Sequence, residues 1–291
     1  MSRIVVTGAS GLLGSSLVPF LRLSGHDVVT QSRGPVTDHC CDLTEGKSAS
    51  SFLRRVQPEL LINLVALTNV DQCEQMPAAA FLANVRVVEN LAVAIHNDCP
   101  GCHLIQISTD QVYDGTGPHC ECDALPKNYY ALSKFAGEVV ALKCSATVLR
   151  TNFIGPSVCS QRRSLSDWVV ESLRNRKQIT VFDDIIFSPL TIATLIRCIE
   201  ITARLRKPGL FNLGAKGGMS KAEFALMLGS ALGLPLDTAI RGKSTLGGIS
   251  PTYRPKDMRM NSSRFETTFG VQLPEFSSEI SSLVPLYSNA T

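Results

Sequence analysis

Residues 4–14 read IVVTGASGLLG, an apolar run that leads directly into three spaced glycines, Gly8, Gly11 and Gly14. Apolar residues then recur at helical spacing, so the stretch predicts a strand, a tight turn and a helix in that order. In such a turn the first glycine permits the bend, the second lets the backbone approach a pyrophosphate, and the third permits close helix packing. The helix N-terminus adds N–H donors for an anion. We therefore expect a dinucleotide to bind along Gly8, Ser10, Gly11, Leu12, Leu13 and Gly14.

The pattern that begins at this turn continues through the first half of the chain, where short apolar runs alternate with longer segments of helical period. Repeated strand–helix–strand units predict an α/β fold with a Rossmann-like, doubly wound parallel sheet. Pro19 should kink or shorten the first helix. Strands are expected at 3–7, 27–32, 59–65, 103–108 and 146–151, and helices at 11–24, 48–57, 77–97 and 129–143.

The alternation of predicted strands and helices becomes irregular after residue 155, with further helices expected at 164–176, 189–204 and 220–232. Residues 252–291 are expected to form a loop-rich lobe without an independent core. At about 150 residues per domain, the 291 residues have room for two parts. We assign 1–155 and 188–214 to a dinucleotide-binding Rossmann domain, and 156–187 and 215–291 to a smaller C-terminal substrate-binding lobe.

The net charge is small, +3 from 28 basic and 25 acidic residues, and gives no electrostatic reason to expect a nucleic-acid partner. Residues 1–150 carry 11 basic and 14 acidic side chains (net −3), whereas residues 151–291 carry 17 and 11 (net +6). A basic second half suits an anionic small ligand, and a solvated basic face is the alternative. The apolar runs are too short or too charged to cross a membrane. Because the chain enters a strand within a few residues of Met1, without a signal peptide, a cytoplasmic location is expected.

Two cysteine spacings match metal or cofactor motifs. Cys99 and Cys102 precede a histidine in a C-x-x-C-H pattern, as in covalent haem attachment, and with Cys120 and Cys122 they could form a four-cysteine zinc site. Haem attachment would require export, and the strand expected at 103–108 separates the two cysteine pairs. We therefore expect reduced thiols and no metal site.

The end of the second expected strand bears on the choice of cofactor. Ser32 and Arg33 stand there instead of the acidic residue that would bind the 2′-hydroxyl of NAD. A guanidinium suits a 2′-phosphate, so we expect NADPH, with NADH as the alternative. The competing interpretation of Arg33 is an exposed loop arginine.

Three residues form a candidate catalytic set. Thr109 closes the fourth expected strand, and Tyr130 and Lys134 lie four residues apart in the next helix, on one face. A free phenol titrates near 10, and an adjacent ammonium lowers that pKa by stabilising the phenolate. Tyr130 is therefore expected to transfer a proton, and Thr109 to polarise a substrate carbonyl at the carboxyl end of its strand.

Further stretches carry a resemblance that spans almost the whole chain: GASGLLG at 8–14, VDQCE at 70–74, ISTDQVYDGTG at 107–117, PKNYYALSKFAGE at 126–138, VLRT at 148–151 and Arg254-Pro255. With them the chain resembles the extended short-chain dehydrogenase/reductases, and most closely the dTDP-4-dehydrorhamnose reductases. The resemblance implies that Thr109, Tyr130 and Lys134 form the catalytic triad and that Lys134 holds the nicotinamide ribose. It also implies that Asp42 and Leu43 lie near the adenine and that Ala66 and Leu67 line the cofactor groove.

The same resemblance places Val70, Asp110, Gln111 and Phe153 at the substrate. Gln111 stands where close relatives usually have an aromatic residue, and Phe153 where they often have Trp, so an altered sugar pocket is expected. Some relatives bridge a dimer through magnesium with acidic residues. Ser16 and Thr194 stand in that neighbourhood here, so no magnesium site is expected.

The leading interpretation is an NADPH-dependent reductase of a nucleotide-activated 4-keto-6-deoxysugar, as in dTDP-rhamnose and polysaccharide biosynthesis. Arg254, in the basic half, is the candidate for the diphosphate, and a homodimer is allowed. One alternative is a reductase of a UDP-linked 4-keto-amino-sugar, or an epimerase, using the same triad. A dehydratase is less favoured because Gln111 follows Asp110 where a further acidic residue is usual. Another class is a non-catalytic regulatory subunit, similar to the β subunit of methionine adenosyltransferase.

Overall fold

The computed structural model describes residues 2–159, 162–244 and 252–288, and the chain divides into two compact units. The sheet unit comprises Met1–Thr109, Asn128–Arg150 and Ile196–Phe211. The C-terminal unit comprises Asp110–Lys127, Thr151–Leu195 and Asn212–Thr291. Residues 110–127 thus belong to the C-terminal unit, although the sequence places them within the first expected domain.

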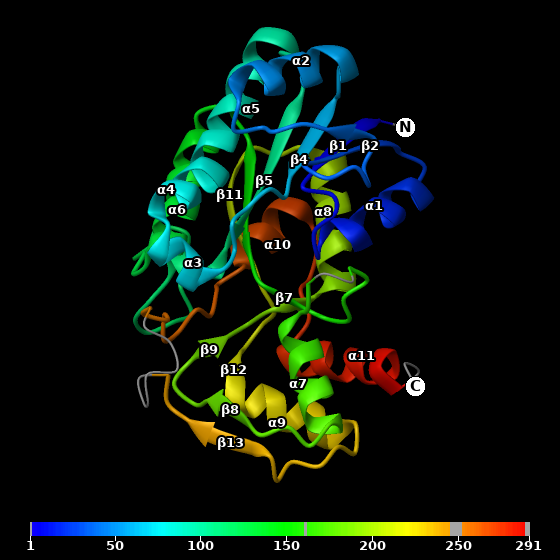
Figure 1. The fold of residues 1–291 in the computed structure, drawn as a ribbon. Helices are drawn as coiled ribbons and strands as arrows, with labels where there is room; N and C mark the ends of the chain where they lie inside the picture. The colour runs from blue at the N-terminus through cyan, green and yellow to red at the C-terminus, as the bar shows by residue number, and fades with distance from the viewer. Residues whose placement is uncertain (1, 160–161, 245–251, 289–291) are drawn as a thin grey trace. The chain divides into compact units, whose positions relative to one another are not determined.

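A seven-stranded sheet is the centre of the sheet unit (Figure 1). Its strands are β1 (Arg3–Thr7), β2 (Asp27–Ser32), β3 (His39–Cys40), β4 (Leu60–Asn63), β5 (His103–Thr109), β6 (Thr147–Thr151) and β11 (Gly209–Leu213). Their order is β11-β6-β5-β4-β1-β2-β3, and the pairs from β3 to β5 are parallel. The predicted Rossmann-like sheet is confirmed. The order reverses beside β1, which is where such sheets bind ligands at the carboxyl ends of their strands.

Helices cover both faces of this sheet. They are α1 (Gly14–Leu23), α2 (Gly46–Val56), α3 (Val70–Gln75), α4 (Pro77–Phe81), the π turn η1 (Leu82–Arg86), α5 (Val87–Asp98), α6 (Tyr129–Leu142) and α8 (Ile192–Leu205), of which residues 196–205 belong here. On one face, α2, α5 and α6 bury Leu53, Leu91 and Ala141 against Val5 of β1. On the other face, α1 contacts β1 and β2, and α8 lies beside it (Figure 1).

Two expected helices differ in detail from the prediction. The first begins at Gly14 instead of residue 11 because the intervening residues form the glycine turn, and it continues past Pro19 to Leu23. The segment expected at 77–97 forms α4, η1 and α5, so the backbone passes through a π turn at Leu82–Arg86. In the described part of the chain, Pro77–Asp98 is the only helical stretch long and apolar enough to cross a membrane, and half of it is buried inside the protein.

The C-terminal unit has its own aromatic core. Phe187 packs edge-on against Phe224 and Phe276, with ring centroids 5.6 and 5.4 Å away. The unit contains the short 3₁₀ turn η2 (Asp110–Val112), the strands β7 (Phe153–Ile154), β8 (Ile179–Phe182), β9 (Ile186–Phe187), β10 (Leu190–Thr191), β12 (Met219–Ser220) and β13 (Ala239–Gly242), and the helices α7 (Leu165–Arg174), α9 (Lys221–Ala231), α10 (Ser263–Phe269) and α11 (Phe276–Ser288). The expectation of a loop-rich final segment is wrong, because α10 and α11 bury Phe265, Phe276 and Leu283 in this unit.

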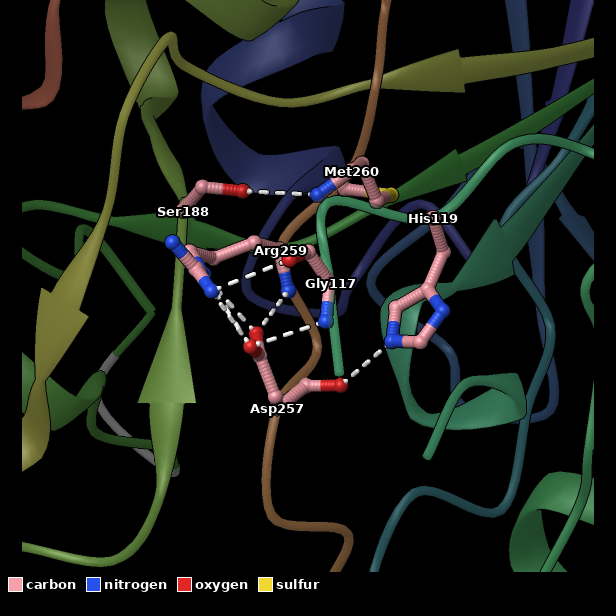
Figure 2. Close-up of polar contacts among 6 residues, drawn as sticks. All are labelled: Gly117, His119, Ser188, Asp257, Arg259 and Met260. Atoms are coloured by element: carbon pink, nitrogen blue, oxygen red, sulfur yellow. Dashed lines mark hydrogen bonds and ion pairs between the residues drawn. The ribbon is translucent and has the colours of Figure 1, made fainter. Parts of the chain in front are cut away.

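A partly buried polar cluster ties residues 110–127 to the C-terminal part of this unit (Figure 2). The carboxylate of Asp257 accepts the Gly117 N–H at 2.9 Å and binds the Arg259 guanidinium at 2.6 Å. His119 contacts the Asp257 carbonyl oxygen through Nε2 at 2.9 Å, and its ring stacks on Tyr113. These bonds explain why residues 110–127 belong to the C-terminal unit.

Candidate active site

The glycine turn between β1 and α1 has the tight geometry that its sequence predicts. Gly8 has a φ of +68°, and a Cβ there would lie 2.9 Å from the Val65 nitrogen beyond β4. The Gly11 N–H donates to the Gly8 carbonyl at 3.0 Å. At Gly14 a Cβ would lie only 2.4 Å from the Ala9 carbonyl oxygen. The turn thus has three positions without side chains at the start of a helix, which fits the pyrophosphate of a dinucleotide.

Ser32 and Arg33 stand at the carboxyl end of β2. The Ser32 hydroxyl accepts the Gly34 N–H at 3.1 Å, and Arg33 is exposed. Hydrogen bonds from the backbone and hydroxyl of Thr44 hold the pKa of Asp42 below its usual range, and the positive charge of Arg33 adds to this effect. Arg33 and Asp42, both predicted to contact the adenosine half of the cofactor, are therefore electrostatic neighbours. Leu43, which follows Asp42, is buried in the hydrophobic core.

The segment after β4 contains Ala66 and Leu67, and an asparagine holds it in place. The Leu67 N–H donates to Asn84 Oδ1 at 2.8 Å, and Asn84 Nδ2 donates to the Leu67 carbonyl at 3.1 Å. Asn84 Nδ2 also lies 2.9 Å from the Ser133 hydroxyl on α6. Asn84 is almost fully buried within the π turn, and the motifs did not identify it. The sequence feature that could have pointed to Asn84 is its single amide side chain on the otherwise apolar, buried side of this helical segment.

Tyr130, Leu67 and Val70 lie in one small apolar cluster, with Cys73 and Ala80. This places a predicted catalytic residue beside a predicted cofactor residue and a predicted substrate residue. Tyr130 is 7% exposed, so its ring is largely shielded from water. Asn128 begins the helix that carries it, because its side chain accepts the Ala131 N–H at 2.8 Å.

Lys134 lies one turn after Tyr130 on α6 and is 5% exposed. Its Nζ donates to the Ile107 carbonyl of β5 at 2.6 Å, two residues before Thr109. Burial lowers the pKa of Lys134 to about 8, and the charge of Glu138 opposes that shift. The three predicted catalytic residues thus come from two adjoining elements, the carboxyl end of β5 and the first turns of α6. A buried ammonium one helical turn from a tyrosine is an arrangement suited to proton transfer near neutral pH.

The remaining predicted substrate residues belong to the C-terminal unit. Asp110 accepts a hydrogen bond from Asn152 Nδ2 at 2.7 Å, next to Phe153. Gln111 and Phe153 are partly buried, and so is Arg254.

One more cation lies near these residues. Lys221 begins α9, and burial lowers its pKa, with Asp110 opposing the shift and Arg254 adding to it. The three charged groups are therefore neighbours within the C-terminal unit. Lys221 was not predicted from the sequence, because a lysine at the start of a helix carries no motif.

The cysteines are free thiols throughout. Cys99 and Cys102 are buried, whereas Cys120 and Cys122 are exposed. Within residues 2–159, 162–244 and 252–288, no group of three or more His, Cys, Asp or Glu side chains could hold a metal ion. Thr194, which stands in the neighbourhood where some relatives have acidic residues that bind magnesium, donates its hydroxyl hydrogen to Glu279 Oε1 at 2.8 Å inside the C-terminal unit.

The family model described as the RmlD substrate binding domain matches residues 2–288. The chain belongs to this family. Its sequence is 31% identical to the dTDP-4-dehydrorhamnose reductase of Sinorhizobium fredii, over 97% of this chain and 96% of that protein. It is 27% identical to the dTDP-4-dehydrorhamnose reductase of Escherichia coli K12, over 94% of each.

Solved structures agree on the fold. The crystal structure of dTDP-4-dehydrorhamnose reductase from Bacillus anthracis in complex with NADP aligns with a TM-score of 0.88 and 24% identity, over 98% of this chain and 99% of that one. A dTDP-4-dehydrorhamnose reductase of Clostridium acetobutylicum aligns with a TM-score of 0.87, also at 24% identity. The family membership predicted from the motifs is confirmed by the family model, and these two structures share the fold.

Proposed function

We propose that the chain is an NADPH-dependent reductase of a nucleotide-activated 4-keto-6-deoxysugar. Membership of the family makes it an NAD(P)-dependent oxidoreductase, and relatives from Sinorhizobium and Escherichia are named dTDP-4-dehydrorhamnose reductases. The observation that carries the proposal is the buried Lys134 one turn from Tyr130, at the carboxyl end of β5. That pair is what a carbonyl reduction requires of the protein.

The reaction needs one proton donor and one group that polarises the ketone. When bound, the reduced nicotinamide supplies the hydride to the C4 carbon. Tyr130 donates its phenolic proton to the oxygen, and the ammonium of Lys134 stabilises the phenolate that remains. Thr109 donates a hydrogen bond to the same oxygen and so favours charge developing there. Bulk solvent then returns a proton to Tyr130.

The residues around the triad would hold the cofactor. The turn Gly8–Gly14 receives the pyrophosphate, and Arg33 with Ser32 receives the 2′-phosphate, which favours NADPH over NADH. Asp42 and Leu43 lie at the adenine, and Ala66 and Leu67 along the groove. Lys134 would also hold the nicotinamide ribose.

The C-terminal unit would bind the sugar nucleotide. Arg254 has Lys221 as a neighbour, and two cations suit a diphosphate. Asp110, Gln111 and Phe153 would contact the sugar. Because Gln111 stands where relatives usually have an aromatic residue, and Phe153 where they often have the larger Trp, a UDP-linked 4-keto-amino-sugar is the competing substrate.

A direct assay tests the proposal. The loss of NADPH absorbance is followed with dTDP-, UDP- and GDP-linked 4-keto sugars, and thermal stability is measured with dTDP and UDP on the NADPH-loaded protein. We expect one 4-keto sugar nucleotide to be reduced and its nucleotide to raise Tm. No turnover with any of them, together with an Arg254→Ala variant that binds every sugar nucleotide normally, would favour a regulatory subunit. A cytoplasmic location and a homodimer remain parts of this proposal.

A further inference from the structure

A buried ion pair lies beside the ammonium of Lys134 and takes no part in the reaction described above. The Arg150 guanidinium binds the Glu138 carboxylate through Nε at 3.0 and 3.1 Å and through Nη2 at 2.6 Å. Both side chains are 1% exposed. Burying two charges so completely is costly unless geometry and hydrogen bonds compensate, so the pair needs an explanation beyond stability.

The pair is connected to both elements of the candidate catalytic site. Glu138 lies four residues after Lys134 on α6, on the same helix face. The Ser108 hydroxyl of β5 donates to the Glu138 carboxylate. Ser108 stands between Ile107, whose carbonyl accepts from Lys134, and Thr109. One carboxylate therefore joins the helix that carries Lys134 to the strand that carries Thr109.

We propose that Glu138 is a positioning residue, which Arg150 and Ser108 hold in place so that the Lys134 ammonium stays charged and fixed beside the end of β5. This inference rests on the proposed function, since it assigns the purpose of Lys134 to catalysis. The Arg150 guanidinium lies 2.6 Å from the carboxylate and so offsets part of the cost of burying its charge. Among the described residues, Glu138 is the charged group whose field favours the charged form of Lys134 against burial.

The test uses a double variant, Glu138→Gln/Arg150→Met, because a single change would leave one buried charge unpaired and strongly destabilise the fold. The titration of Lys134 is followed by NMR of its ε-carbon in lysine-labelled protein, with Lys134→Arg identifying the signal. We expect the titration midpoint to move to lower pH in the double variant. The alkaline limb of the kcat/KM profile should move in the same direction, whereas a merely structural loss would lower activity equally at every pH.

A matched control removes an ion pair of the same charges elsewhere in the sheet unit. Arg3 and Asp27 bind each other at 2.8 Å on the exposed part of β1 and β2, so Arg3→Met/Asp27→Asn should leave the Lys134 midpoint unchanged. A Lys134 midpoint that is the same in the unaltered protein and in Glu138→Gln/Arg150→Met overturns the inference. Absence of turnover by the unaltered protein counts against the proposed function instead, and the two failures are distinguishable.

A second variant keeps the inference testable if the double variant does not fold. Ser108→Ala removes one hydroxyl and leaves the ion pair, so it loosens the carboxylate from β5. We expect kcat to fall about 3- to 10-fold, through less accurate placement of the ammonium, while the Lys134 midpoint stays in place. An unchanged kcat would show that the link to β5 has no positioning role.

Discussion

Asn84 and Leu67 form a reciprocal pair of hydrogen bonds: the Leu67 N–H donates to Asn84 Oδ1 at 2.8 Å, and Asn84 Nδ2 donates to the Leu67 carbonyl at 3.1 Å. The Asn84 side chain, in the π turn, thereby supplies the hydrogen bonds that a neighbouring strand would otherwise give to the backbone just beyond β4. Because Leu67 packs against the apolar cluster that contains Tyr130, the pair also fixes the backbone beside the candidate site. Its loss should affect both folding and cofactor binding.

We expect Asn84→Ala to lower the free energy of unfolding by about 1–3 kcal/mol, since the backbone groups of Leu67 lose their partner. The Kd for NADPH should rise as the Ala66–Leu67 segment loosens. Chemical denaturation and fluorescence titration measure the two effects. Asn97→Ala, on the exposed face of α5, is the control and should change neither. Equal stability of the Asn84→Ala variant and the unaltered protein would contradict the role of this pair.

Tyr130→Phe removes the transferable proton and keeps the ring. We expect kcat to fall at least ~100-fold with little change in the Kd for NADPH, because the hydroxyl acts on the reacting oxygen. Steady-state kinetics with the substrate found in the panel assay provide the measurement. Turnover close to that of the unaltered protein would exclude Tyr130 as the proton donor.

Lys134 should make stability depend on pH in a defined window. Burial lowers its pKa from 10.5 to about 8 in the folded chain. Between these values the unfolded chain still holds the proton that the folded chain has released, so the free energy of unfolding due to Lys134 rises with pH. Below about pH 8 Lys134 is protonated in both the folded and the unfolded chain, and its contribution to the free energy of unfolding stays at its minimum.

Denaturation of the unaltered protein and of Lys134→Met at about pH 7 and about pH 10 measures this effect. The unfolding free energy of the unaltered protein minus that of Lys134→Met should be larger at the higher pH than at the lower. A difference that stays constant across the range would mean that the ammonium is not desolvated.

Arg33→Ala tests the choice between the two nicotinamide cofactors. In the unaltered protein NADPH should bind more tightly than NADH, and the variant should narrow that gap by about 1–2 kcal/mol through loss of a charge-assisted bond. The Kd values for both cofactors are compared by titration. Equal affinities in the unaltered protein would indicate that Arg33 serves no 2′-phosphate.

Gly14→Ala should damage the turn itself. The new Cβ would lie 2.4 Å from the Ala9 carbonyl oxygen, which is backbone and cannot move away alone. We expect a loss of at least about 2 kcal/mol in unfolding free energy, together with weaker NADPH binding. Gly101→Ala is the matched control, because a Cβ there has no neighbour within 4 Å and should cost no more than about 0.5 kcal/mol. If both variants were equally stable, the packing argument for Gly14 would fail.

Local signals in the sequence accounted for much of the sheet unit. The strands at 3–7 and 27–32 are found where predicted, and the glycine turn, Tyr130 and Lys134 lie on the expected elements. Each depends on interactions within a few residues: alternating apolar faces, a turn that only glycine allows, and side chains one helical turn apart. The C-terminal helices α10 and α11 were missed because their apolar positions are few and interrupted, and they form helices by packing on a distant aromatic core.

The sequence by itself determined the Rossmann-like fold, the family and the identity of the candidate triad, because these follow from short-range spacing. Only the tertiary structure decided which residues far apart in the sequence become neighbours within each unit. Asn84 reaches Leu67 across 17 positions, Ser108 reaches Glu138 across 30, and Lys221 becomes a neighbour of Asp110 and Arg254. Such pairings depend on how the strands and helices pack together. Packing also buries the Lys134 side chain, and the resulting shift of its pKa cannot be predicted from the neighbouring residues in the sequence.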